Sequence, residues 1–136
     1  MTQRMTQRLE YFDRAYARFI EAFDRHITDP SDHVVTAGLI QTYEFTLELA
    51  WKTLKDYLES QGYEIHGGRD AIREAITAGL DIDGRTWLEA IDDRNKIAHT
   101  YNEDIAKQVT QKIESQYKTM LEKMSILLHV LADENK

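Results

Sequence analysis

The apolar residues of this sequence recur at steps of three and four along most of its length. That spacing lines one face of an α-helix and does not fit a half-buried strand, in which apolar and polar residues alternate. The first stripe predicts a helix over residues 4–28. It consists of Met5, Leu9, Phe12, Tyr16, Phe19, Phe23 and Ile27. Because no segment shows a convincing strand pattern, we expect an all-α protein, an up-and-down bundle of roughly four to five helices.

Short polar and glycine-rich segments divide the rest of the chain into further helices. Residues 29–32 contain the only proline and end with two side chains that accept bonds from the first amides of a helix. A second helix is therefore expected from Val34 onward. The glycine-containing stretch 61–68 ends that helix, and a short third helix over 69–78 ends at Gly79.

The C-terminal part of the chain contains two more predicted helices. One begins near Asp83 and Gly84 and continues into the segment 92–101. Asn102 then caps the last helix, because its side chain accepts a bond from an amide of the first turn. The apolar stripe of this last helix consists of Ile105, Val109, Ile113, Tyr117, Met120, Met124, Leu127 and Leu131.

Two features of the second helix leave alternatives open. Gly38 lowers helix propensity, so it either allows the close approach of a neighbouring helix or is a glycine tolerated at the surface. Glu48 forms either an ordinary intrahelical pair with Lys52 or, if it faces the bundle, a buried polar pair with Arg73. The buried pair would mark a specific packing point or a pocket.

Composition bounds the classes of protein to which the chain can belong. Its 136 residues, 42% of them hydrophobic, suit one domain over residues 1–136. No window approaches about 18 consecutive apolar residues and the N-terminus lacks an apolar signal core, so we expect a cytoplasmic protein without a membrane segment. The absence of cysteine excludes disulfides and thiolate catalysis. The histidines lack the spacing of metal ligands, so we expect neither a metal site nor a cofactor.

The net charge limits how the chain can meet nucleic acid. With 24 acidic against 17 basic residues, the formal net charge is −7. The average surface therefore repels a DNA duplex, and any contact with nucleic acid must depend on a local cationic site.

The segment 92–101 concentrates the residues that carry chemistry. It contains a permanent cation, Arg94, a group that exchanges protons near neutral pH, His99, and a phenol, Tyr101. On a straight helix with about 100° per residue, Arg94 and Tyr101 fall within about 20° of each other, whereas Arg94 and His99 are about 140° apart. The three converge only if the chain bends or ends near residues 97–98, or if a second copy related by twofold symmetry completes the site. We favour the second copy.

These groups suit the metal-free cleavage of RNA. Histidine can take a proton from the ribose 2′-OH or return one to the leaving 5′-oxygen, and arginine can neutralise the charge that develops on the pentacoordinate phosphate. A symmetric pair of histidines supplies both base and acid. Asn95 is able to orient either group through its amide. Lys96 either guides phosphate or is a solvated neighbour of Asp92 and Asp93.

A purely structural interpretation of the same residues remains open at this point. Arg94 then pairs only with Glu89 or Asp93, His99 is a capping or half-buried residue at the helix end, and Tyr101 packs its ring under the next helix. In a helical dimer of this kind, Arg94 and His99 point away from each other into separate salt bridges.

The segment from Arg94 to Tyr101 matches the Arg-x4-6-His-x-Tyr signature of HEPN domains, with a polar residue directly after the arginine. Three further segments, residues 43–58, 69–75 and 87–89, precede it in the expected order and spacing. Together they resemble the nucleotidyltransferase substrate-binding protein family, the HepT-like branch of HEPN proteins, over most of residues 8–131. Lys96 is a flexible cation at a position where we expect an apolar or small residue to be at least as common. This difference bears on the RNA preference and leaves Arg94 and His99 in place.

The resemblance implies a homodimeric helical bundle, usually encoded beside a minimal nucleotidyltransferase. In HepT-type modules the HEPN protein is an endoribonuclease toxin, and Arg94 and His99 match its catalytic pair. The nucleotidyltransferase silences the toxin by transferring AMP from ATP to the motif tyrosine, which corresponds to Tyr101. Other members of this branch are non-catalytic substrate-binding subunits of a two-component nucleotidyltransferase complex, and the acidic net charge suits docking onto a cationic partner.

Overall fold

The computed structural model of the chain describes residues 3–134, and every regular element in that range is helical. The elements are α1 (Gln3–Thr28), α2 (His33–Ser60), α3 (Gly68–Thr77), α4 (Gly84–His99), α5 (Glu103–Lys112), a π-helical turn (Ile113–Tyr117) and α6 (Lys118–Glu134). The all-α prediction is confirmed. Within the described residues, no helix is long and apolar enough to span a bilayer.

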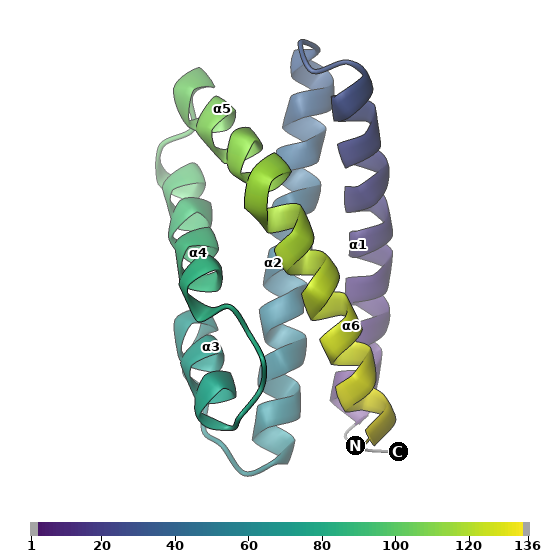
Figure 1. The fold of residues 1–136 in the computed structure, drawn as a ribbon, viewed down its shortest axis with the longest axis vertical. Helices are drawn as coiled ribbons and strands as arrows, with labels where there is room; N and C mark the ends of the chain where they lie inside the picture. The colour runs from purple at the N-terminus through teal and green to yellow at the C-terminus, as the bar shows by residue number, and fades with distance from the viewer. Residues whose placement is uncertain (1–2, 135–136) are drawn as a thin grey trace.

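α2 is the central helix of the bundle. It forms a long hairpin with α1 and also contacts α3, α5 and α6. The rod made by α5 and α6 crosses α2 diagonally (Figure 1). α3 and α4 lie on the side of α2 that is opposite α1. Tyr43 of α2 stacks on Tyr117 with ring centroids 5.6 Å apart, and both side chains are fully buried. The junction between α4 and α5 lies at the edge of the molecule, away from this central packing (Figure 1).

Side-chain caps set the beginnings of three helices where the sequence predicted them. Asp32 accepts bonds from the backbone N–H groups of the first turn of α2. Asn102 accepts a bond of 3.0 Å from the backbone N–H of Ile105 and begins α5. Asp83 begins α4, where it accepts bonds from the Thr86 hydroxyl at 2.7 Å and the Thr86 backbone N–H at 3.2 Å. These two bonds lower the pKa of Asp83 below its usual range.

We expect Asp83→Ala to lower the free energy of unfolding by about 1 kcal/mol at neutral pH, because the first turn of α4 loses its cap. Since the pKa of Asp83 is lower in the folded than in the unfolded chain, the stabilisation is present above the unfolded value, about 4. It is lost as the pH falls through the folded value. Urea unfolding at neutral pH and in acid measures both effects, with the exposed Asp81→Ala as control. An equal loss for Asp83→Ala in acid and at neutral pH would contradict this account.

The last predicted helix is interrupted by the π-helical turn, and the reason lies in its apolar spacing. Val109, Ile113 and Tyr117 are four residues apart, and each step of four rotates by about 40° around an α-helix. A π-turn holds more residues per turn and therefore keeps Ile113 and Tyr117 on the buried side. Beyond the turn the buried position is Leu128, whereas the predicted Leu127 is only half-buried.

The structure corrects the end of the first apolar stripe. Ile27 was expected in the core, but it is 53% exposed, and the neighbouring His26 is buried instead. The last turn of α1 therefore directs an imidazole rather than an aliphatic side chain toward α5 and the π-turn. At Gly38, an added Cβ would meet no atom within 4 Å, which supports the surface interpretation of this glycine.

Candidate functional site

The candidate residues lie on the last turns of α4 and on the junction that follows it. α4 runs unbroken through residues 97–98 and ends at His99, and the next residue, Thr100, has a non-helical backbone (φ −147°, ψ 83°). The structure therefore lacks the earlier bend that would gather the three residues in one chain. Because Tyr101 lies beyond the end of α4, the angle of about 20° from Arg94 that holds on a continuous helix does not apply to it.

The side chain of Arg94 extends from α4 toward α2, and 31% of it is exposed. Its Nε is 3.7 Å from Oε1 of Glu48, and that nitrogen is buried without a hydrogen bond. Glu48 also pairs with Lys52, whose Nζ is 3.8 Å from its Oε2. The expected intrahelical pair is therefore present, whereas the Arg73 alternative is replaced by Arg94. The structural interpretation in which Arg94 pairs with Glu89 or Asp93 is wrong.

His99 and Tyr101 are both exposed. Within residues 3–134, neither the His99 ring nor the Tyr101 hydroxyl takes part in a hydrogen bond or an ion pair. Tyr101 is 57% exposed, so it does not pack under the next helix. The His99 ring is accordingly accessible to solvent or a ligand.

The two residues after Arg94 differ in their surroundings. Asn95 is exposed and lines a cavity that it shares with Arg94. The Nζ of Lys96 lies 3.9 Å from Oδ1 of Asp93, and its side chain is largely exposed. Lys96 is thus the solvated neighbour of Asp93 that the sequence offered as one alternative.

Two separate cavities lie next to these residues. The arginine cavity has a volume of about 420 Å³ and lies between α2, α3 and α4. Its lining includes Glu48, Trp51, Arg69, Arg73, Arg94 and Asn95. The tyrosine cavity has a volume of about 710 Å³ and lies between the α1–α2 turn and α5. Its lining includes His26, His33, Tyr101, Glu103, Lys107 and Glu114.

His99 lines neither cavity, and Arg94 and Tyr101 line different ones. One copy of the chain therefore does not bring the three motif residues into a common cleft. Over the described residues, no group of three histidine, aspartate or glutamate side chains is arranged to hold a metal ion.

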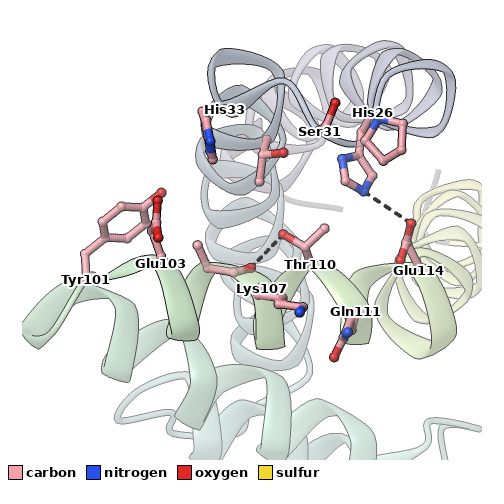
Figure 2. Close-up of a pocket in the computed structure, with 12 residues that line it drawn as sticks. His26, Ser31, His33, Tyr101, Glu103, Lys107, Thr110, Gln111 and Glu114 are labelled. Carbon is pink, nitrogen blue, oxygen red and sulfur yellow. Dashed lines mark hydrogen bonds and ion pairs between the residues drawn. The ribbon is translucent and has the colours of Figure 1, made fainter.

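The tyrosine cavity contains a polar pair that sequence reasoning missed. Tyr101 and Glu103 stand at one end of the cavity, and His26 and Glu114 stand at the other (Figure 2). Nε2 of His26 lies 3.2 Å from Oε1 of Glu114. The two residues are 88 positions apart, so no local pattern joins them. The one available signal was the polar His26 directly beside an apolar stripe.

A buried carboxylate fixes the helix that carries Arg94. Oδ2 of Asp93 accepts a bond of 2.5 Å from the Tyr117 hydroxyl and one of 3.0 Å from Nζ of Lys112. Burial and the bond to Asp93 raise the pKa of Tyr117. Lys112 also pairs with Glu89 at 2.5 Å, and this bond and that to Asp93 raise the pKa of the Lys112 ammonium. Arg94 therefore follows a residue that is anchored to the π-helical turn.

Comparison with known proteins places this helical chain in a family. The family described as "Nucleotidyltransferase substrate binding protein like" matches residues 7–129. The chain belongs to this family, in its HepT-like branch. It is 31% identical over 126 residues to the "Probable ribonuclease HepT" of Haemophilus influenzae, covering 86% of this chain and 84% of that protein. A crystal structure of a Thermus thermophilus protein is similar with a TM-score of 0.68 and 28% identity, covering 90% of this chain and 97% of that one.

Proposed function

We propose that this chain is the toxin of a HepT-like toxin–antitoxin module, a metal-independent endoribonuclease that acts as a cytoplasmic homodimer. Arg94 and His99 are its catalytic residues. The observation that carries the proposal is the exposed, unpaired His99 ring at the end of the helix that bears Arg94. The Haemophilus influenzae relative is named a probable ribonuclease, which supports the same activity.

A second copy is needed because of the geometry of α4. Arg94 and His99 are five residues apart on one unbroken helix, which places them about 140° apart around its axis. They consequently face different surfaces of the same chain. In a twofold dimer, the α4 segment of the second copy brings an arginine and a histidine to the same phosphate.

The proposed reaction begins when His99 of one copy takes the proton of a ribose 2′-OH. The 2′-oxygen attacks the adjacent phosphorus, and the bond between phosphorus and the 5′-oxygen breaks. His99 of the second copy donates a proton to that leaving oxygen. Arg94 neutralises the charge of the pentacoordinate phosphate. Asn95 orients Arg94 or His99 through its side-chain amide. DNA lacks the attacking hydroxyl and is not a substrate.

Expression of the chain alone in bacteria tests the toxin proposal. We expect the wild-type chain to arrest growth and His99→Ala and Arg94→Ala to leave growth normal. The proposal is refuted if growth stays normal with the wild type and with both variants and if the purified protein does not cleave RNA.

Tyr101 is the proposed site of nucleotidylation by a minimal nucleotidyltransferase encoded nearby. The phenol oxygen attacks the α-phosphorus of ATP and forms an O–P bond, while the bond from that phosphorus to the bridging oxygen breaks. Pyrophosphate leaves, and the phenol proton passes to solvent. The exposure of Tyr101 and its place at the rim of a cavity of about 710 Å³ support this assignment, because an enzyme can reach the hydroxyl. An attached AMP adds negative charge and bulk near His99, which opposes the binding of an RNA phosphate.

Co-expression with the neighbouring nucleotidyltransferase is expected to raise the mass of the wild-type chain by one or more AMP units. Tyr101→Phe removes the attacking oxygen, so its mass should not change. Tyr11→Phe is the matched control, because Tyr11 is also exposed but lies on α1. Intact-mass spectrometry measures the result, and modification of Tyr101→Phe to the level of the wild type would disprove the assignment.

The alternative is a non-catalytic substrate-binding subunit of a two-component nucleotidyltransferase complex. The description of the matched family favours it, as does the separation of Arg94 and His99 within one chain. This alternative predicts stable co-purification with the nucleotidyltransferase and a changed rate of nucleotide transfer in the complex. It fails if the two proteins do not associate.

A further inference from the structure

The arginine cavity gathers positive charge on a chain whose formal net charge is −7. Arg69 and Arg73 reach it from α3, and Arg94 reaches it from α4. Arg69 pairs with Asp92, and Arg94 pairs with Glu48. Arg73 is exposed, and no carboxylate within residues 3–134 forms an ion pair with it. Its guanidinium is therefore available to a ligand.

Asp70 is the acidic residue on the cavity wall that lies nearest to Arg73 in sequence, and its carboxylate already accepts a hydrogen bond. Oδ2 of Asp70 accepts a bond of 2.9 Å from the backbone N–H of His66, in the loop that precedes α3. That bond holds the Asp70 carboxylate at the loop. Glu48 is likewise shared between Arg94 and Lys52. The charge of Arg73 thus stays uncompensated by an ion pair.

The indole of Trp51 forms a wall of this cavity and is partly buried. A Cβ built at Gly68 would lie 3.1 Å from Cε2 of Trp51, so the start of α3 packs directly against the ring. Nζ of Lys52 lies 5.8 Å from the Trp51 ring centroid. Because the start of α3 and the Lys52 ammonium already lie against the ring, the cavity suits a phosphate group better than a stacked base.

We propose that the arginine cavity binds a phosphate of the RNA strand next to the phosphate that is cleaved, with Arg73 as the principal contact. The proposal rests on the proposed function, because Arg94 and Asn95 line this cavity and also belong to the catalytic segment. In the proposed dimer Arg94 contacts the cleaved phosphate, so Arg73, which lines the same cavity as Arg94, lies where the neighbouring phosphate of that strand can reach it. A guanidinium can donate two parallel bonds to phosphate oxygens. The cavity thereby supplies the local cationic site that an acidic protein needs to hold RNA.

Binding of a labelled single-stranded RNA oligonucleotide to the His99→Ala protein tests this inference without cleavage. Adding Arg73→Ala should weaken binding about tenfold, because a charge-assisted contact is lost. It should also reduce the slope of log affinity against log salt by about 0.7, which corresponds to one phosphate contact. Arg73→Lys should recover part of both quantities. The matched control is Arg85→Ala, which removes the same charge from the exposed start of α4, and its affinity should change less than about twofold.

Equal affinities and salt slopes for Arg73→Ala and Arg85→Ala would overturn the inference. Binding of AMP and ATP provides a second arm, because a nucleotide carries the same phosphate chemistry. If Arg73→Ala weakens nucleotide binding and leaves RNA binding unchanged, the RNA assignment is wrong. If the protein with native His99 cleaves RNA but Arg73→Ala leaves RNA binding unchanged, this inference alone is overturned. Arg73-dependent binding without any cleavage overturns the proposed ribonuclease function, and the cavity then stands as an RNA-phosphate site without a cleaved neighbour.

Discussion

His99→Ala is expected to lower the rate of RNA cleavage by about 10²- to 10⁴-fold. The reaction then loses the group that takes the proton from the 2′-OH and the group that donates one to the leaving 5′-oxygen. The ring is exposed and unpaired in the described structure, so its removal should leave the fold intact. The measurement is the single-turnover rate on a labelled RNA, with thermal unfolding as a check of integrity. His129→Ala is the matched control, because His129 pairs with Asp13 on the α1–α6 side of the bundle.

Arg94→Ala should reduce the same rate by about 10²- to 10³-fold through lost stabilisation of the phosphate charge. Arg94→Lys keeps the charge but loses the forked geometry, so only part of the activity should return. Glu48 retains Lys52 as a partner in both variants, which limits the effect on stability. Wild-type rates for His99→Ala or Arg94→Ala would contradict the catalytic assignment.

Asp93→Ala is expected to lower the free energy of unfolding by about 3 kcal/mol, because the buried Tyr117 hydroxyl loses its acceptor and Lys112 loses one of two carboxylates. Tyr117→Phe removes only the hydroxyl and should cost about 1–2 kcal/mol. Urea unfolding measures these changes.

Asp92→Ala is the control for this prediction. Asp92 is exposed and pairs with Arg69, so its loss should cost less than about 1 kcal/mol. If Asp93→Ala and Asp92→Ala were equally stable, the buried network would not anchor α4 as described.

Local chemistry made most helix boundaries predictable. Asp32, Asp83 and Asn102 each begin a helix because an aspartate or asparagine side chain binds amides only a few residues ahead. Gly79 ends α3 with φ +87°, a conformation that glycine adopts without steric cost. Such signals lie within one turn of the position that they determine, so one sequence suffices to find them.

Long-range partners were not predictable in the same way. Glu48 meets Arg94 rather than Arg73, and His26 meets Glu114, because the packing of whole helices decides which polar side chains face each other. The spacing of apolar residues is compatible with the π-helical turn, but it does not show that Tyr117 bonds to Asp93, 24 positions earlier in the chain. A single chain also places Arg94 and His99 apart, so the catalytic pairing and the homodimer stay predictions.

The ends that the wild-type protein leaves on a single-stranded RNA, with a chelator present to remove divalent metals, test the central claim most directly. Attack by the 2′-oxygen predicts a 2′,3′-cyclic phosphate on one product and a 5′-hydroxyl on the other. An RNA with a 2′-deoxyribose at the cleaved nucleotide should stay intact. A product with a 5′-phosphate, a requirement for added metal, or the absence of cleavage would contradict the account.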